Sequence, residues 1–233
     1  MEFVDVVRHQ LAVSRGGRPP WRPPRPFAPH GIGELFRPDA VVEVEDRRLG
    51  LSVHTAGPLH LTSGRLVAAD PSSLDFDAVP FTVLVPPGSY PVSVSLATFV
   101  DDPRHSRVCA VRLDVTHQPV IRWEMALRDG QEPLELGYGE FFGFGVDAGM
   151  ACFVDADAAG RMQDVWRTLA GLVEPRYRTI DSGAMVAWSS GWGDGAYPTW
   201  IGYDATGSVA CFVADMLLFP TGDDAQDDEE DED

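Results

Sequence analysis

The sequence predicts a mainly β (α+β) fold, an antiparallel sandwich or open barrel with two or three short helices. From residue 41 onward, apolar and polar residues mostly alternate, which is the period of a half-buried strand. Clusters of Gly, Pro, Asp and Ser separate the alternating segments, as expected for turns. The predicted strands are residues 41–45, 49–54, 65–69, 80–85, 90–98, 107–116, 120–127, 150–154, 183–189, 196–203 and 207–219.

The two ends of the chain differ from this β-rich body. Apolar residues at helical spacing predict a short helix over residues 2–13. Residues 18–29 are rich in Pro and Arg, which predicts an extended arm. Residues 222–233 hold nine of the chain's 36 acidic residues and no basic one, so we expect a disordered, solvated tail. The predicted parts are the helix and arm (1–40), one β-rich domain (41–220) and the acidic tail (221–233).

Helical spacing returns once within the β-rich body. Asp155 precedes an apolar stripe and is placed to cap the N-terminus of the helix, and Pro175 follows its end. The stripe consists of Met162, Val165, Trp166, Leu169 and Leu172.

A first hairpin is predicted from charge pairing. When strand 107–116 pairs with strand 120–127, Asp114 lies opposite Arg122 and Arg112 lies opposite Glu124. Opposite charges across a ladder favour such a pairing.

A second hairpin is predicted around the turn at residues 204–207, between residues 199–203 and a return strand from Ser208 to Phe219. The return strand is apolar on both faces, which is typical of a central strand covered on both sides.

Charge and cysteine content restrict the class of protein. A net charge of -18 argues against nucleic-acid binding, because phosphate contacts need clustered cations. Cys109, Cys152 and Cys211 lie in apolar runs typical of buried free thiols, and their spacing predicts neither a disulfide framework nor a zinc site. No apolar run approaches the roughly 18 residues of a membrane-spanning helix. We therefore expect a cytoplasmic protein that binds neither nucleic acid nor membrane.

The segment 190–198 is the leading candidate site. Three alternating glycines surround Asp194, and Trp192 and Tyr197 flank it as the expected exposed aromatic pair. Glycine lets the backbone adopt positive φ and lets another group approach closely. Such a loop can cradle a ligand, together with the turn at Asp147, or it can form a simple bend. The candidate ligand-binding residues are Trp192, Gly193, Asp194, Gly195, Tyr197 and Asp147.

An alternative assigns a metal site to three carboxylates. Asp147, Asp155 and Asp194 could converge as oxygen ligands for Mg²⁺ or Ca²⁺. The ion would then activate water in a hydrolase or transferase. Each residue also has a structural explanation, as a helix cap for Asp155 and as a turn residue for the other two. On the leading interpretation no cofactor is predicted.

Several motifs follow one another in an order that carries a family resemblance. They are Leu61–Pro71, Pro87–Val92, Trp123–Ala126, Gly145–Gly149 and Ser190–Tyr197. Over about residues 55–219 the chain resembles the DUF4241 family of bacterial domains of unknown function. The resemblance implies a shared domain in a bacterial protein, and it implies no activity.

The leading functional hypothesis is a non-catalytic domain that binds a small-molecule ligand or a protein, because the loop motifs come without a complete catalytic arrangement. No nucleophile elbow or dinucleotide motif accompanies them. The alternatives are the metal-dependent enzyme and an acidic immunity-type or decoy protein that binds a basic partner.

Overall fold

The computed structural model describes residues 26–162, 164–169 and 176–219. The predicted helix at 2–13, most of the Pro- and Arg-rich arm and the acidic tail lie outside these residues. The chain divides into two compact units. The larger unit comprises residues 29–129 and 142–220, and the smaller one comprises residues 1–28, 130–141 and 221–233.

The smaller unit contains a short 3₁₀ turn, η2 (Pro133–Glu135), among its described residues. The rings of Phe27 and Phe141 lie with their centroids 5.6 Å apart. The Phe27 N–H donates a hydrogen bond to the Glu140 carbonyl at 2.8 Å. These two contacts join the end of the Pro- and Arg-rich arm to the end of the segment 130–141 within the smaller unit.

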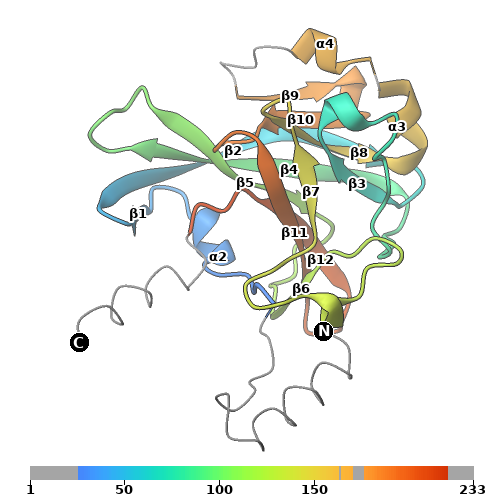
Figure 1. The fold of residues 1–233 in the computed structure, drawn as a ribbon, viewed down its shortest axis with the longest axis horizontal. Helices are drawn as coiled ribbons and strands as arrows, with labels where there is room; N and C mark the ends of the chain where they lie inside the picture. The colour runs from blue at the N-terminus through green and yellow to red at the C-terminus, as the bar shows by residue number, and fades with distance from the viewer. Residues whose placement is uncertain (1–25, 163, 170–175, 220–233) are drawn as a thin grey trace, which may run out of the picture. The chain divides into compact units, whose positions relative to one another are not determined.

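The larger unit is mainly β, and its larger sheet is antiparallel and curls into half a barrel, as the predicted fold class requires (Figure 1). The strand order is β1–β2–β4–β5–β12–β11–β6, and β7 pairs with β11. The strands are β1 (Val41–Val44), β2 (Arg47–Leu61), β4 (Gly88–Phe99), β5 (Ser106–Asp114), β6 (Arg122–Met125), β7 (Gly143–Val146), β11 (Gly195–Tyr203) and β12 (Val209–Asp215).

A smaller antiparallel sheet in the same unit has the order β3–β8–β10–β9. One of its faces is covered by helices α3 (Ala156–Met162) and α4 (Trp166–Leu169), whose buried residues include Ala158, Met162 and Leu169. The strands are β3 (Leu66–Ala69), β8 (Met150–Asp155), β9 (Tyr177–Ile180) and β10 (Met185–Ser189), and short 3₁₀ turns lie at η1 (Pro71–Ser73) and η3 (Asp181–Gly183).

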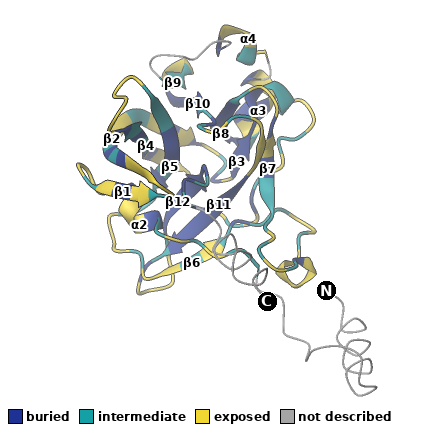
Figure 2. Cartoon of the chain, turned by 60° about the vertical axis from the view of Figure 1, so that its left-hand side comes forward, coloured by how far each residue is buried: buried dark blue, intermediate teal, exposed yellow. Residues whose placement is uncertain are grey.

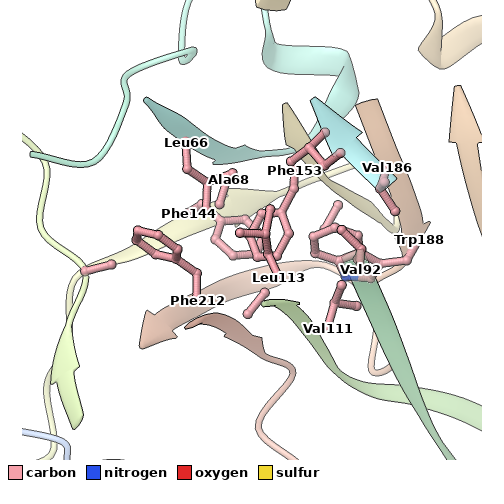
Figure 3. Close-up of a cluster of buried hydrophobic side chains, with 14 of the residues drawn as sticks. Leu66, Ala68, Val92, Val111, Leu113, Phe144, Phe153, Val186, Trp188 and Phe212 are labelled. Carbon is pink, nitrogen blue, oxygen red and sulfur yellow. The ribbon is translucent and has the colours of Figure 1, made fainter. Parts of the chain in front are cut away.

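The main core lies between the two sheets (Figure 3). Every residue of β8 is buried, because alternate side chains face the larger sheet and the helices. Figure 2 shows the same full burial along most of β10 and β12. The large side chains of this core include Phe144, Phe153, Trp188 and Phe212. None of the helices in the described part of the chain has the length and apolar character to span a bilayer.

Helix α2 (Ile32–Leu35) packs on the other face of the larger sheet. Its Ile32 and Leu35 are buried. The Ser95 hydroxyl of β4 donates a hydrogen bond to the Leu35 carbonyl, and the Cys109 thiol donates to Ser95 Oγ at 3.2 Å. This polar chain fastens α2 to the sheet, so the β-rich unit begins before the predicted boundary at residue 41.

Most predicted strands are present, with shifted ends. The segment 80–85 forms only isolated bridges, through Phe81 and Leu84. Strand β2 continues through Pro58 to Leu61 because a bulge between Thr55 and Gly57 absorbs the irregular residues. The short strands β7 and β9 were not predicted, since Gly-rich and Arg-containing segments carry no clear alternation.

The hairpin predicted between residues 107–116 and 120–127 is wrong. Strand β5 pairs with β4 and β12, and β6 pairs with β11. The predicted charge pairs do not form, and the same four residues pair within each strand instead, Arg112 with Asp114 and Arg122 with Glu124. Residues i and i+2 lie on the same face of a strand, so each Arg can pair with an acidic residue of its own strand. The charge pattern therefore does not show which strand is the neighbour.

The second predicted hairpin is confirmed. Strands β11 and β12 pair directly, and β12 is a central strand between β5 and β11. The Asp204 carboxylate accepts hydrogen bonds from the N–H and hydroxyl of Thr206 and from the Ser208 N–H. The Thr206 hydroxyl, followed by the backbone donors, lowers the pKa of Asp204 against its desolvation. This carboxylate therefore fixes the turn.

A buried carboxyl group ends β12. Asp215 accepts hydrogen bonds from the Trp200 indole N–H at 3.1 Å and from the Leu217 N–H at 2.9 Å. Desolvation by burial outweighs both bonds and raises the pKa of Asp215 to about 6. The folded state thus binds this proton more tightly than the unfolded state.

We expect Asp215 to give the fold a pH dependence that Asp215→Asn removes. Because the folded-state pKa is raised, the contribution to the free energy of unfolding is greatest near pH 4, falls as the pH rises through 6, and is constant above that. At about 1.4 kcal/mol per pKa unit, the fall is on the order of 3 kcal/mol. Urea unfolding of both proteins from pH 4 to pH 7.5 measures the difference. A difference that stays the same at every pH contradicts the prediction.

Candidate functional site

The glycine-rich loop and the Asp147 turn lie side by side, as the sequence predicts. Strand β7 pairs with the start of β11, which sets Val146 opposite Gly195. The Gly149 N–H donates a hydrogen bond to Asp194 Oδ1 at 3.1 Å, and the Ser190 N–H donates to the Gly149 carbonyl at 3.0 Å. The two segments therefore form one surface of the larger unit.

The loop itself is a tightly bonded turn. The Ser190 hydroxyl and the Tyr197 hydroxyl both donate to the Gly193 carbonyl, at 2.7 and 2.8 Å. Tyr197 is only 4% exposed and packs against Phe144, so the expectation that it is exposed is wrong. It lies within β11, which starts at Gly195, and alternation turns it toward the core. Trp192 is 44% exposed, as predicted.

One of the three loop glycines has a clear structural role. Gly191 has a φ of 72°, and a Cβ there would collide with the Val108 carbonyl. A Cβ at Gly193 would meet open space. Gly191 is therefore required by the turn itself. Ligand binding by Trp192, Gly193, Asp194, Gly195 and Asp147 stays a prediction.

Asp70 holds the Asp147 turn and was not predicted as a site residue. Its buried carboxylate accepts hydrogen bonds from the backbone N–H groups of Asp147 and Ala148, at 2.9 and 2.7 Å, and from the Ser72 N–H at 2.7 Å. The Asp147 side chain is exposed. The Asp-Pro sequence at the start of η1 indicates that Asp70 caps this turn through the Ser72 N–H. Nothing near Asp70 in the sequence indicates its hydrogen bonds with Asp147 and Ala148.

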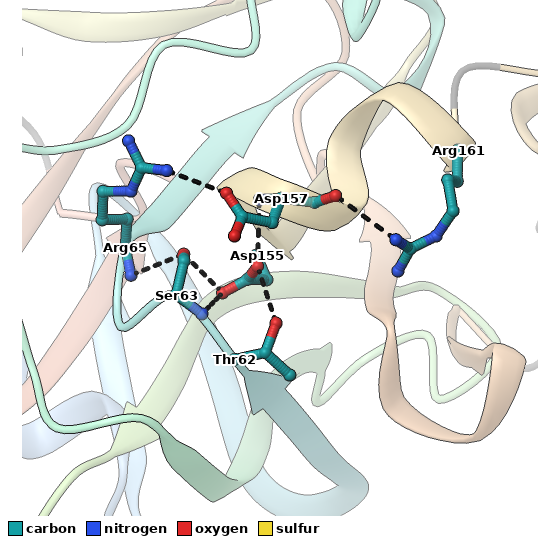
Figure 4. Close-up of polar contacts among 6 residues, drawn as sticks. All are labelled: Thr62, Ser63, Arg65, Asp155, Asp157 and Arg161. Atoms are coloured by element: carbon teal, nitrogen blue, oxygen red, sulfur yellow. Dashed lines mark hydrogen bonds and ion pairs between the residues drawn. The ribbon is translucent and has the colours of Figure 1, made fainter.

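Asp155 is a structural carboxylate, not part of the loop surface (Figure 4). It is fully buried at the end of β8. Oδ1 accepts from the Thr62 hydroxyl and from the Asp157 N–H, and Oδ2 accepts from the Ser63 N–H and hydroxyl. The predicted capping of α3 is present, and both oxygens are engaged with protein donors.

The structure does not bring the three carboxylates of the metal alternative together. The described residues contain no group of three His, Cys, Asp or Glu side chains that could hold a metal ion. Asp194 lies beside the Asp147 turn, whereas Asp155 is enclosed by Thr62 and Ser63. The alternative therefore lacks the convergence it requires.

The three cysteines are buried, as predicted. Desolvation by burial raises the pKa of Cys109 and of Cys211 to about 12, and it raises the pKa of Cys152 further. A thiol held protonated at neutral pH is a poor nucleophile. None of these thiols fits a covalent mechanism.

A pocket lies elsewhere in the larger unit, on the face of the larger sheet that α2 covers. Its volume is about 420 Å³, within the range of small-molecule sites. We call it the Arg112 pocket. It is lined by Ile32, Gly33, Phe36, Arg112, Asp114, Thr116, His117, Gln118, Pro119, Val120, Trp123, Ala210 and Cys211.

One row of residues across four strands forms part of the pocket wall. Pairing aligns Asp114 with Cys211, Cys211 with Gly202, and Gly202 with Trp123. A Cβ at Gly202 would lie 2.7 Å from Val120 Cγ2 and 3.0 Å from the Trp123 ring. Glycine at this position therefore lets Val120 and Trp123 pack closely onto the sheet.

Arg112 is the cation of this pocket. Its Nε lies 2.9 Å from Asp114 Oδ1, and its guanidinium lies over the Phe36 ring, 4.6 Å from the centroid. Desolvation raises the pKa of Asp114, against the lowering effects of Arg112 and then His117. The pocket thus combines a half-buried ion pair with aromatic walls.

The sequence prediction missed this pocket because it assigned Arg112 and Asp114 to the wrong hairpin. One usable signal was Gly202, which is an isolated glycine between Ile201 and Tyr203 in a predicted strand. Such a glycine indicates a close approach by another group. The strand pattern gives no indication that α2 packs on this face of the sheet and lines the pocket.

The fold and this pocket define a two-sheet β domain with a cavity of small-molecule size. The chain belongs to the family described as "Protein of unknown function (DUF4241)", whose model matches residues 59–214. This confirms the resemblance found from the ordered motifs. No curated protein matches the chain, and no solved structure matches it.

We expect Asp194→Ala and Asp147→Ala to differ in stability. Asp194 accepts the Gly149 N–H, so its loss should lower the free energy of unfolding by about 1 kcal/mol. The exposed Asp147 side chain should change it by less than about 0.5 kcal/mol. Chemical denaturation at pH 7 measures both. Equal losses contradict the structural role given to Asp194.

We expect Asp155→Ala to lower the free energy of unfolding by about 3 kcal/mol or more, because it removes a helix cap and leaves the Ser63 and Thr62 donors without their acceptor. The loss should be the same in Mg²⁺, in Ca²⁺ and in EDTA. Thermal unfolding in the three buffers measures it. A stabilisation by either ion that Asp155→Ala abolishes would restore the metal alternative.

Proposed function

We propose that this chain is a non-catalytic binding domain whose ligand is a small molecule held in the Arg112 pocket. The observation that carries the proposal is a cavity of about 420 Å³ with a half-buried ion pair and aromatic side chains on its walls. Binding sites for small molecules are mostly apolar hollows with a few placed polar groups. The pocket has apolar and aromatic side chains such as Ile32, Phe36 and Trp123, and its polar part is larger than in a typical site, with the ion pair joined by Thr116, His117 and Gln118.

The chemistry of the side chains favours binding over catalysis. The thiols are buried and protonated, and the Asp155 carboxylate is engaged by protein donors. Arg112 forms an ion pair with Asp114 and its guanidinium lies over the Phe36 ring, so it is suited to holding a ligand and not to proton transfer. A cytoplasmic location and a bacterial source remain predictions.

A protein partner would bind at the surface formed by the glycine-rich loop and the Asp147 turn. Trp192 is exposed in the glycine-rich loop, and an exposed indole can anchor a partner's side chain. The immunity-type or decoy alternative depends on the acidic tail, which lies outside the described residues. The pocket is the better-supported site, since its residues come from α2, β5, β6 and β12 and enclose a defined volume.

The test obstructs the pocket without disturbing the fold. Gly33 lines the pocket, and a Cβ there would meet open space, so Gly33→Trp should be tolerated while its ring enters the cavity mouth. Compounds from a general fragment library that raise the melting temperature of the unchanged protein should lose at least tenfold in affinity for Gly33→Trp.

Gly160→Trp is the matched control. Gly160 is also a helical, exposed glycine with open space around it, and it lies in α3 away from the pocket lining. Its affinity for the same compounds should equal that of the unchanged protein. Compounds that bind both tryptophan variants equally, or a library in which nothing binds the unchanged protein, overturn the proposed function.

A further inference from the structure

The geometry of the Arg112 pocket points to a specific class of ligand: a small organic carboxylate with a flat apolar body, whose carboxylate is bound by Arg112. This inference rests on the proposed function and deepens it. It is supported by the contacts of the guanidinium, the aromatic residues around it and the strand register that places them together.

The guanidinium has one edge available for an anion. Asp114 approaches Nε, and the guanidinium carbon lies over the Phe36 ring. No described residue accepts a hydrogen bond from the two terminal nitrogens of Arg112. These two nitrogens form a fork that matches the two oxygens of a carboxylate. The contact with the Phe36 ring and the ion pair with Asp114 restrain the side chain, so little conformational freedom is lost on binding.

The apolar part of the lining suits a flat apolar body, and Thr116, His117 and Gln118 add polar groups beside it. Trp123 and Phe36 contribute ring surface, and Val120 and Ile32 contribute aliphatic surface. Gly202 lets the Trp123 ring lie close to the sheet. An aromatic or similarly flat ligand can therefore pack against the walls while its carboxylate meets the guanidinium.

Asp114 limits which ligands are accepted. It is the ion-pair partner of Arg112, so an incoming carboxylate competes with it for the guanidinium. An amide of the same shape would leave the Arg112 fork without an anionic partner, and would bind more weakly. Replacing Asp114 with Asn removes the competing charge and keeps the side-chain shape. The carboxylate ligand should then bind more tightly.

The experiment uses benzoate, benzamide and benzylamine as probes on the full chain, with binding followed by isothermal titration calorimetry at pH 7. We expect the unchanged protein to bind benzoate at least tenfold more tightly than benzamide. Asp114→Asn should increase benzoate affinity about threefold to tenfold and leave benzamide unaffected. Arg112→Gln should lose benzoate binding at least tenfold.

A double variant keeps the test valid if Arg112→Gln does not fold. Arg112→Gln combined with Asp114→Asn leaves no unpaired charge in the pocket, and removing both partners of an ion pair is tolerated better than removing one. It should bind benzoate and benzamide equally. A marked preference for benzoate in this variant overturns the inference, because Arg112 would then not be the anion's partner.

The remaining outcomes separate the inference from the proposed function. Equal binding of benzoate and benzamide to the unchanged protein, or a preference for benzylamine through Asp114, overturns the carboxylate inference and leaves a working pocket. Loss of all three probes in Gly33→Trp places them in the pocket, whereas binding unchanged by Gly33→Trp places them elsewhere. If none of the probes binds but library compounds do, the carboxylate inference alone fails.

Discussion

The packing of the smaller sheet onto the larger one is the contact on which the rest of the larger unit depends. Phe153 and Trp188 of the smaller sheet meet edge to face, with ring centroids 4.9 Å apart, within the same core as Phe212 of β12. Because β8 and β10 are also covered on their outer face by α3 and α4, their backbones are fixed from both sides. The loops that leave these strands therefore start from well-defined positions.

Buried carboxylates then shape those loops. Asp70, Asp155 and Asp215 each accept bonds from backbone N–H groups, and the loops they serve would otherwise leave buried donors unpaired. This use explains why an acidic chain forms no cluster of metal ligands among its described residues. Acidic side chains here organise the backbone, and Arg112 provides the cation of the pocket.

The strand pattern predicted the class of fold and several of its elements correctly. The β11–β12 hairpin followed from the turn residues at 204–207, which act locally through Asp204. The β5–β6 pairing was wrong because the same charges are satisfied within each strand. The exposed Trp192 was predicted from its place in the loop. Tyr197 was assigned to the same loop although it also lies in the predicted strand 196–203, and in β11 its side chain faces the core.

The sequence by itself determined the antiparallel β-rich domain, the buried thiols, the helix cap at Asp155 and the family. These depend on residue type and on neighbours close along the chain. The tertiary structure alone decided which strands are neighbours, and with that it placed Asp114, Cys211, Gly202 and Trp123 in one row under α2. The reason is that alternation fixes which face a side chain occupies, whereas the strand that pairs beside it is selected by packing between distant segments.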